Sequence, residues 1–306
     1  MAAPETVHRA APAKLNLYLH IVGRRADGFH LIDSLVAFAG VHDTVSAAKS
    51  DALTLTLEGP FAAALSGEAD NLVLRAARAL ADVAGVRPWA ALRLVKRLPV
   101  ASGIGGGSAD AAATLAAASA LWRITPKPGA LAKLALTLGA DVPVCLAGKA
   151  AQVSGIGEKL APAPALPRAP LVLVNPLKAL PTPAVFKALS GPFSKPAPLE
   201  AGAGAPRDAR DLAEALEARR NDLTDAAIGL VPEIKTILAA LATQPGCLLA
   251  RMSGSGAACF ALFARDEEAQ AAAAALVAAK PGWWVKASEL VSDCAMLTAS
   301  LYEGGR

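Results

Sequence analysis

Hydrophobic and polar residues alternate early in the chain, within the segment KLNLYLHIVG. One face of this segment is apolar, with Leu15, Leu17, Leu19 and Ile21. The other face is polar, with Lys14, Asn16, Tyr18 and His20. A period of two is typical of a β-strand, so we expect a strand with one polar side. The Asp and Gly of the following GRRADGFH segment predict a turn.

Helical spacing follows further along. Leu72, Ala76 and Leu80 recur on one side of a helix predicted over 70–83, with Asp70 or Asn71 as its cap. Helices are also expected over 109–122, 128–138, 208–220, 232–242 and 266–279. Strands are expected over 35–39, 44–47, 53–57, 92–95 and 171–176 and in CLLARM, AACFALF and WWVKASEL. Between them, GADVPVCLAGKAAQVSGIGEKL is expected to form a turn, a short strand and a turn.

The order of these elements predicts a mixed, largely antiparallel α+β protein in two halves. The 306 residues are enough for two domains, and we expect them over 1–163 and 164–306. Gly, Pro, Ala and Ser dominate 190–207, which indicates a surface loop or a flexible insertion.

Composition argues against several classes of protein. Although 54% of the residues are hydrophobic, no charge-free stretch reaches the roughly 18 residues of a membrane helix. The first residues lack the pattern of a secretion signal, so we expect a cytoplasmic protein. A net charge of +4, spread along the chain, gives no reason to expect nucleic acid as a partner. Four widely spaced cysteines suggest neither disulfides nor a zinc site, and we expect them to be buried small hydrophobes.

The segment LPVASGIGGGSADAAATLAAASALW places a glycine-rich loop directly before an alanine-rich helix. Glycines let the backbone approach a ligand closely, and the start of a helix offers unpaired N–H donors and a positive dipole end. We therefore expect a phosphate cradle over 103–108. The lack of lysine excludes a P-loop, and Ser108 stands where a dinucleotide fingerprint needs its third glycine. A glycine-rich turn capped by Ser108 and Asp110 is the alternative.

The motif GIGGGSAD with its alanine-rich helix resembles the phosphate-binding motif of the GHMP kinases, named for galactose, homoserine, mevalonate and phosphomevalonate kinases. The segments APAKLNLYLHIVGRRADGFH, LTLGADVPVCLAG and SGSGAACFALF resemble the branch of this family that acts on a cytidylyl alcohol, and DNLVLRAARAL and KRLP fit it too. The resemblance implies ATP and Mg²⁺ as cofactors and phosphorylation of a tertiary hydroxyl. It also implies a ribosomal S5 domain 2-like ATP-binding half followed by a ferredoxin-like half, with the site between them.

Two catalytic residues are implied by the resemblance. Asp141, in LGADVPV, is the candidate general base, and Lys14, in PAKLNL, would lie beside it and balance charge. The alternatives are an aspartate that caps a turn and a solvated strand lysine.

The nucleotide and the substrate are assigned in the same way. For ATP the resemblance implies Asn71 and Lys96 near the adenine, and for the phosphates Pro99, Val100, Ala101, Ser102, Gly103, Ile104, Gly105, Gly106, Gly107, Ser108 and Ala109. For the cytidylyl substrate it implies Asn16, Phe29, His30, Thr182 and Phe186. Phe29 replaces the family's usual tyrosine and keeps a stacking face without the hydroxyl. Asp110 either caps backbone donors or reaches magnesium, and no acidic cluster indicates the metal ligands.

Several readings stay open. Phe186 is alternatively a core aromatic, and the loop 253–258 is either a second phosphate loop or a tight turn. The whole chain is alternatively another small-alcohol kinase of this family or a nucleotide-binding sensor without catalysis. A monomer and a weak homodimer are both compatible with the sequence.

Overall fold

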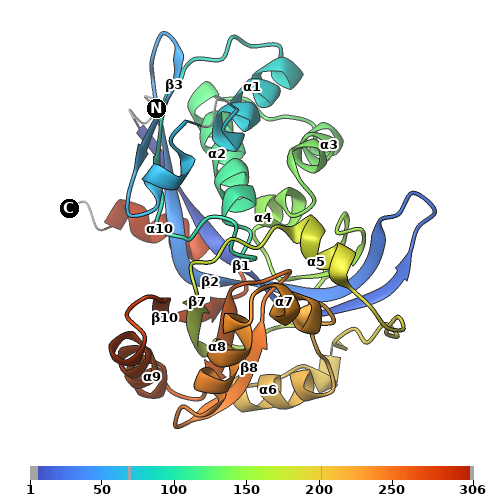
Figure 1. Ribbon diagram of the computed structural model, residues 1–306. Coiled ribbons are helices and arrows are strands. Elements are labelled where there is room, and N and C mark those ends of the chain that lie inside the picture. Colours follow the sequence, from blue (N-terminus) through green and yellow to red (C-terminus); the bar gives the residue numbers. More distant parts are fainter. Residues whose placement is uncertain (1–5, 68–69, 201, 304–306) are drawn as a thin grey trace.

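A computed structural model describes residues 6–67, 70–200 and 202–303 (Figure 1). Its framework is a hairpin of two long strands, β1 (Thr6–Arg24) and β2 (His30–Ala48). We predicted shorter strands here, two of them within β2. The pairing instead continues through register shifts near Pro12, Asn16 and Ile21. Such bulges accommodate proline and glycine within a strand, so these residues bend the hairpin rather than end it.

The other strands extend this hairpin into one mixed sheet that joins both halves of the chain. The order along the sheet is β3-β4-β2-β10-β7-β9-β8; β1 and β5 also pair with β2, and β6 pairs with β5. Among the strands of the described residues, only β3 and β4 pair in parallel. The strands other than β1 and β2 are β3 (Leu53–Glu58), β4 (Ala90–Val95), β5 (Ala151–Gly155), β6 (Lys159–Pro162), β7 (Pro170–Asn175), β8 (Cys247–Met252), β9 (Cys259–Phe263) and β10 (Trp284–Val291). The α+β class with largely antiparallel pairing is thus confirmed.

The described part of the first half has four helices, of which α2 packs on β1 and β2 and the others pack around α2: α1 (Leu72–Ala84), α2 (Gly106–Trp122), α3 (Pro128–Leu138) and α4 (Val142–Ala147). The alanine-rich α2 is buried on nearly all sides because its small side chains let neighbouring elements approach closely. It begins three residues earlier than predicted, since Gly105 takes a left-handed conformation and the helix starts at once. The turn that we predicted after Gly139 was wrong in part: Val142 and Val144 pack inward and stabilise the short α4.

The second half contains α5 (Thr182–Ala188), α6 (Ala209–Glu217), α7 (Thr224–Leu230), α8 (Glu233–Ala242), α9 (Asp266–Ala279) and α10 (Ala295–Glu303), and the chain also has short 3₁₀ turns at Ala62–Leu65 and Gly202–Gly204. We predicted α6, α8 and α9 but not α5, α7 or α10, which have nine residues or fewer. Helix α10 returns to the first half, where the Tyr302 hydroxyl accepts a hydrogen bond from the His8 N–H at 2.9 Å. The predicted boundary at 163/164 falls between β6 and β7 and stays a prediction.

The loop over 190–207, apart from residue 201 outside the described part, is anchored to the long hairpin. The Ser194 N–H donates to the Ile21 carbonyl at 2.8 Å, and the Ala197 N–H donates to Asp33 Oδ2 at 2.6 Å. Leu199 is buried against the core between the halves. The structure therefore favours the surface loop over the flexible insertion.

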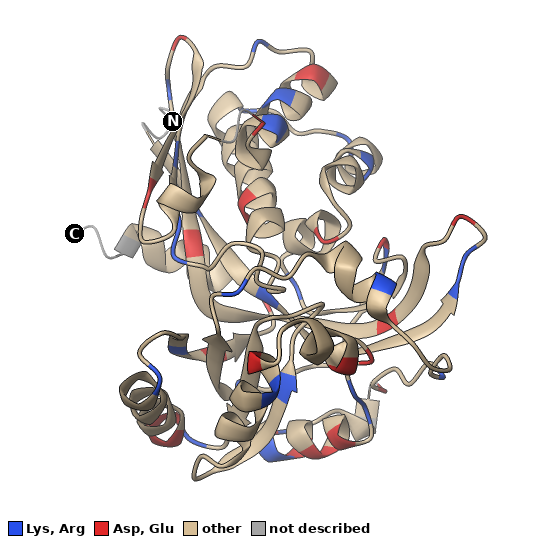
Figure 2. Ribbon diagram, in the orientation of Figure 1, with Lys and Arg blue, Asp and Glu red and all other residues tan. Residues whose placement is uncertain are grey.

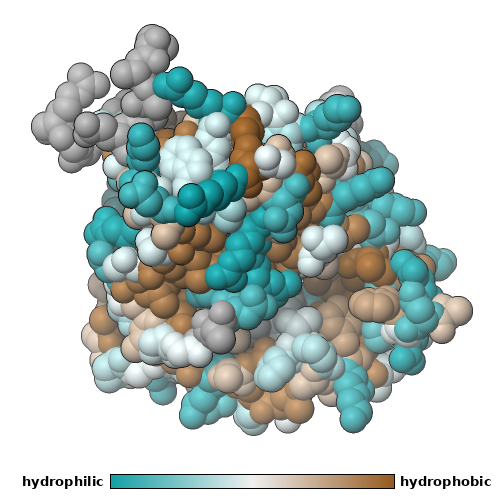
Figure 3. All heavy atoms as spheres, turned by 90° about the horizontal axis from the view of Figure 1, so that it is seen from above, coloured by the Kyte–Doolittle hydropathy of each residue, from teal (hydrophilic) through white to brown (hydrophobic). Residues whose placement is uncertain are grey.

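Membrane and cysteine predictions can be compared with the described residues. None of the helices described is long and apolar enough to cross a membrane. On the face shown in Figure 3, teal polar side chains run between the brown apolar ones. All four cysteines have free thiols, and only Cys259 is buried; the other three are partly buried, which corrects our prediction for them.

Candidate active site

A cavity of about 1000 Å³ lies where the glycine loop, β1, the tip of the β1–β2 hairpin and α5 meet. The structure brings most predicted site residues to its walls: Lys14, Asn16, Phe29, His30, Asn71, Lys96, Pro99, Val100, Ala101, Ser102, Gly103, Gly105, Gly106, Gly107, Ser108, Asp141, Thr182 and Phe186. Two predicted residues do not line it. Ile104 and Ala109 turn their side chains into the core, and the Ala109 N–H bonds to the Gly105 carbonyl.

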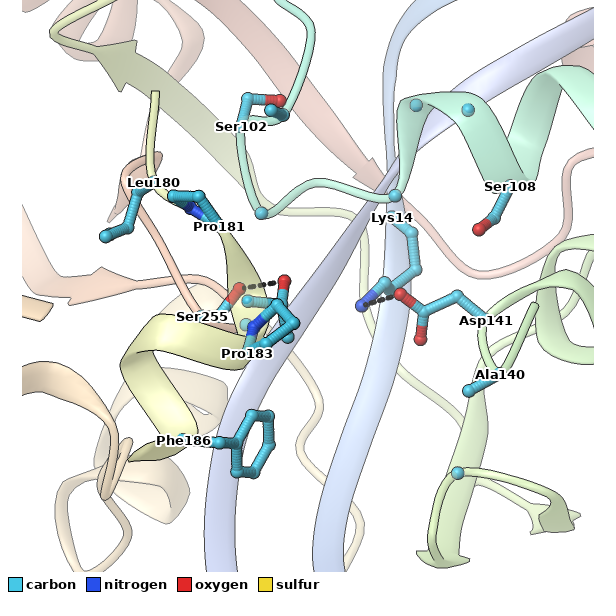
Figure 4. A pocket seen from close by; sticks show the side chains of 18 of the residues that line it. Lys14, Ser102, Ser108, Ala140, Asp141, Leu180, Pro181, Pro183, Phe186 and Ser255 are labelled. Carbon is cyan, nitrogen blue, oxygen red and sulfur yellow. Dashed lines mark hydrogen bonds and ion pairs between the residues drawn. The ribbon is translucent and has the colours of Figure 1, made fainter. Parts of the chain in front are cut away.

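Lys14 and Asp141 meet inside this cavity (Figure 4). Lys14 Nζ lies 3.1 Å from Asp141 Oδ2, and the same ammonium donates to Asn16 Oδ1 at 2.7 Å. Lys14 is buried, which removes the alternative of a solvated strand lysine. Asp141 precedes α4 at its N-cap position, but its side chain makes no capping hydrogen bond and 44% of it is exposed. The cavity therefore contains the partly exposed Asp141 carboxylate next to the buried Lys14 ammonium, which is also hydrogen-bonded to Asn16.

Asn16 connects the Lys14–Asp141 pair to β2 and to the loop that follows β8. Its amide nitrogen donates to Ser34 Oγ at 2.8 Å, and its backbone N–H donates to Ser253 Oγ at 3.1 Å. Lys14 and Asn16 share a face of β1, as the alternation predicted. Because every polar atom of the Asn16 side chain has a partner, its position is fixed before any ligand binds.

The glycine loop approaches its neighbours so closely that side chains would not fit. A Cβ at Gly103 would overlap the Gly256 carbonyl oxygen, and one at Gly105 would come within 3.1 Å of the Lys14 side chain. Both glycines have positive φ, a conformation that other residues rarely adopt. Gly106, Gly107 and Ser108 form the first turn of α2, where N–H groups have no partner within the helix. Such N–H donors at the wall of the cavity are suited to an anion.

The loop over 253–258 lies against the glycine loop. The Ala258 N–H donates to the Ser102 carbonyl at 2.9 Å, and Ser255 Oγ lies 2.8 Å from Thr182 Oγ1. Asn221 fixes this loop by donating to the carbonyls of Met252 and Gly254, both at 2.8 Å. This loop is thus a connection between two strands and also a wall of the cavity. Sequence reasoning missed Asn221, since its partners lie about thirty residues away along the chain.

Lys96 is placed differently from a lysine that points at a base. Its ammonium lies 2.6 Å from both Asp43 Oδ2 and Asp110 Oδ2, and all three side chains are buried. Burial raises the pKa of Asp110 to about 7, against the opposing effect of Lys96. Asp110 therefore pairs with a lysine instead of capping backbone donors. Asp43 was not predicted, since nothing in its local sequence marks it.

Asn71 caps α1, as one of the two predicted caps: its Oδ1 accepts the Val73 N–H at 2.9 Å. It also lines the cavity beside the glycine loop. Both the structural and the nucleotide-binding reading of Asn71 are compatible with this position.

An aromatic pair lies at the other end of the site. The rings of His30 and Phe186 stack with centroids 5.2 Å apart and planes at 29°. Phe186 packs partly on the core and partly faces the cavity (Figure 4), while 59% of Phe29 is exposed. Burial, with a contribution from Arg24, lowers the pKa of His30. A neutral imidazole that both donates and accepts is suited to the edge of a nucleobase.

Comparison with known proteins places both halves of the chain in one family. The model for the GHMP kinases N terminal domain matches residues 71–149, and the model for the GHMP kinases C terminal domain matches 199–281. The chain is 56% identical over 282 residues to a 4-diphosphocytidyl-2-C-methyl-D-erythritol kinase of Paramagnetospirillum magneticum, covering 92% of this chain and 98% of that protein. A protein of the same name from Rhodospirillum rubrum is 54% identical over 299 residues, with 98% and 97% covered.

Solved structures give the same result. A crystal structure of 4-(cytidine 5'-diphospho)-2C-methyl-D-erythritol kinase matches with a TM-score of 0.77 and 34% identity, covering 93% of this chain and 99% of that chain. A homoserine kinase from Cytophaga hutchinsonii, at 19% identity and a TM-score of 0.72, shares the fold. Both halves match, and these relatives align along nearly their whole length, so the chain belongs to the GHMP kinase family.

Proposed function

We propose that this protein transfers the γ-phosphate of ATP to 4-diphosphocytidyl-2-C-methyl-D-erythritol. The acceptor would be the 2-hydroxyl, and the products the 2-phosphate and ADP, in the non-mevalonate route to isoprenoid precursors. Relatives of that name at 50–56% identity support this substrate. The structural observation that carries the proposal is the Lys14–Asp141 pair, which shares one cavity with the glycine loop and the His30–Phe186 stack.

The residues present fit ATP and Mg²⁺. The glycine loop, open to close approach at Gly105, would receive the triphosphate on the N–H groups at the start of α2. The Ser108 hydroxyl, which lines the cavity, offers an oxygen donor of the kind that magnesium binds. When bound, the metal would neutralise charge on the phosphates.

Asp141 would accept the proton of the acceptor hydroxyl. The hydroxyl oxygen would attack the γ-phosphorus of ATP while the bond between that phosphorus and the leaving ADP breaks. Lys14 would hold that oxygen and balance the charge of the transferred group. In phosphoryl transfer such positioning and charge balance supply most of the catalysis. The cytosine would pack against Phe186 and Phe29, with its edge on His30 and with Asn16 and Thr182 contacting the remainder of the substrate.

The test is ADP release by the purified protein with Mg-ATP and this substrate, next to homoserine, mevalonate and galactose. Turnover confined to the cytidylyl substrate, lost in Asp141→Asn but kept in Asp82→Asn on the exposed face of α1, would support the proposal. Phosphorylation of another alcohol would support a different kinase of the family. ATP binding without turnover on any alcohol would support the sensor.

We also propose that the enzyme is cytoplasmic, acts on a small molecule rather than on nucleic acid or membranes, and works as a monomer or weak homodimer. Light scattering across a concentration series tests the last point. A stable tetramer would contradict it.

A further inference from the structure

The proposed substrate carries negative charge on its diphosphate, and the residues described above provide no cation for it. A diphosphate joins its cytidine to its alcohol, and a buried diphosphate needs cations. Lys14 is paired with Asp141, and Lys96 lies between Asp43 and Asp110. Both ammonium groups are thus already paired with carboxylates, and Lys14 is assigned above to the transferred phosphate.

Arg24 is a cavity residue without such a partner. Within the described part of the chain it has no carboxylate in range, and its one side-chain hydrogen bond runs from Nε to the Gly28 carbonyl at 3.1 Å. Its terminal NH₂ groups therefore remain for a ligand. Arg24 lies opposite His30 in the β1–β2 register, and directly paired residues project to the same face of a sheet.

Lys187 approaches the same place from α5. It follows Phe186, the residue that stacks on His30, and it also lines the cavity. No carboxylate pairs with it among residues 6–67, 70–200 and 202–303, whereas Lys178 outside the cavity lies 3.9 Å from Glu233. Figure 2 shows basic segments both on the hairpin and on α5.

We infer that Arg24 and Lys187 bind the diphosphate of the cytidylyl substrate, so that this end of the cavity selects a nucleoside diphosphate over a nucleoside. The inference rests on the proposed function, which supplies the diphosphate. Arg24 presents a planar fork that suits two phosphate oxygens, and Lys187 adds a point charge beside the aromatic pair. Together they would hold the substrate between the base-binding end and Asp141.

The test measures binding of cytidine 5'-diphosphate and of cytidine by calorimetry, with saturating ADP present to occupy the ATP site. The variants are Arg24→Gln and Lys187→Gln. Matched controls are Arg25→Gln, whose side chain pairs with Asp27 at 2.7 Å and does not line the cavity, and Lys178→Gln. We expect each variant to lose roughly tenfold in affinity for the diphosphate and nothing for cytidine, with the controls unchanged.

Equal losses for both probes would overturn the inference, because the variants would then disturb base binding. Equal losses in the controls would overturn it too, since a general charge effect would explain them. Turnover separates this result from the proposed function. Wild-type phosphorylation of the cytidylyl alcohol tests the function, whereas a raised KM for that alcohol at nearly unchanged kcat in the two variants tests the diphosphate site.

Discussion

Replacing Lys96 by methionine tests how the glycine loop is supported. The change keeps the aliphatic stem of the side chain but removes the ammonium that lies between Asp43 and Asp110. The side chains of all three residues are nearly inaccessible to solvent. Losing one member of a buried ion pair typically costs about 3–5 kcal/mol. Asp43 still accepts the N–H groups of Arg97 and Leu98 through Oδ1, so most of the cost falls on Asp110.

Asp110 can escape part of this cost by binding a proton. Its pKa is already raised to about 7, and the loss of Lys96 raises it further. Near pH 6 we therefore expect the lower end of the range, about 3 kcal/mol. A raised carboxyl pKa means that the folded state binds more protons than the unfolded state. Stability then falls as pH rises toward that pKa, by up to about 1.4 kcal/mol per pH unit.

The assay is urea denaturation of the wild type and Lys96→Met at about pH 6 and about pH 8, read by tryptophan fluorescence. Lys133→Met, on the exposed side of α3, is the matched control and should change the free energy of unfolding by less than about 0.5 kcal/mol. A loss below about 1 kcal/mol in Lys96→Met, or a loss that does not grow with pH, would refute the reasoning.

Three further predictions follow from the site. Gly103→Ala should raise the KM for ATP at least tenfold in the ADP-release assay, because its Cβ would overlap the Gly256 carbonyl. Gly129→Ala, in α3 outside the cavity and with no atom within 4 Å of the added Cβ, should change that KM little. Phe186→Leu should raise the KM for the cytidylyl substrate roughly tenfold with kcat nearly kept, unlike the exposed loop change Phe193→Leu. Burial lowers the pKa of His20, so at this group the unfolded state binds more protons than the folded state, and His20 destabilises the fold as pH drops below about 6.5. The urea midpoint of His20→Asn should therefore rise relative to that of the wild type as pH drops through this range, and a difference that does not change with pH would refute the prediction.

Much of the secondary structure could be predicted from patterns of neighbouring residues in the sequence. The helices α1, α3, α8 and α9 have their apolar periodicity within their own sequence, and the structure places them close to the predicted bounds. Short helices such as α4 and α7 could not be predicted in this way. Six or seven residues form too few internal hydrogen bonds to be stable alone, so packing decides their conformation.

Some residues of the candidate site could likewise be predicted from the local sequence, whereas others could not. The glycine loop and the face that Lys14 and Asn16 share are properties of adjacent residues, and both were visible in the sequence. Asn221 under the second loop was invisible, because its contacts join segments that are distant along the chain.

The sequence by itself determined the family, the strand and helix periods and the backbone positions that only glycine can occupy, since each depends on neighbouring residues. The tertiary structure alone decided that Lys96 forms ion pairs with two buried aspartates. It also decided that Arg24 and Lys187 line the cavity without a carboxylate partner in the described chain. Charge pairing depends on distance in space, and folding sets that distance through contacts that no local pattern encodes.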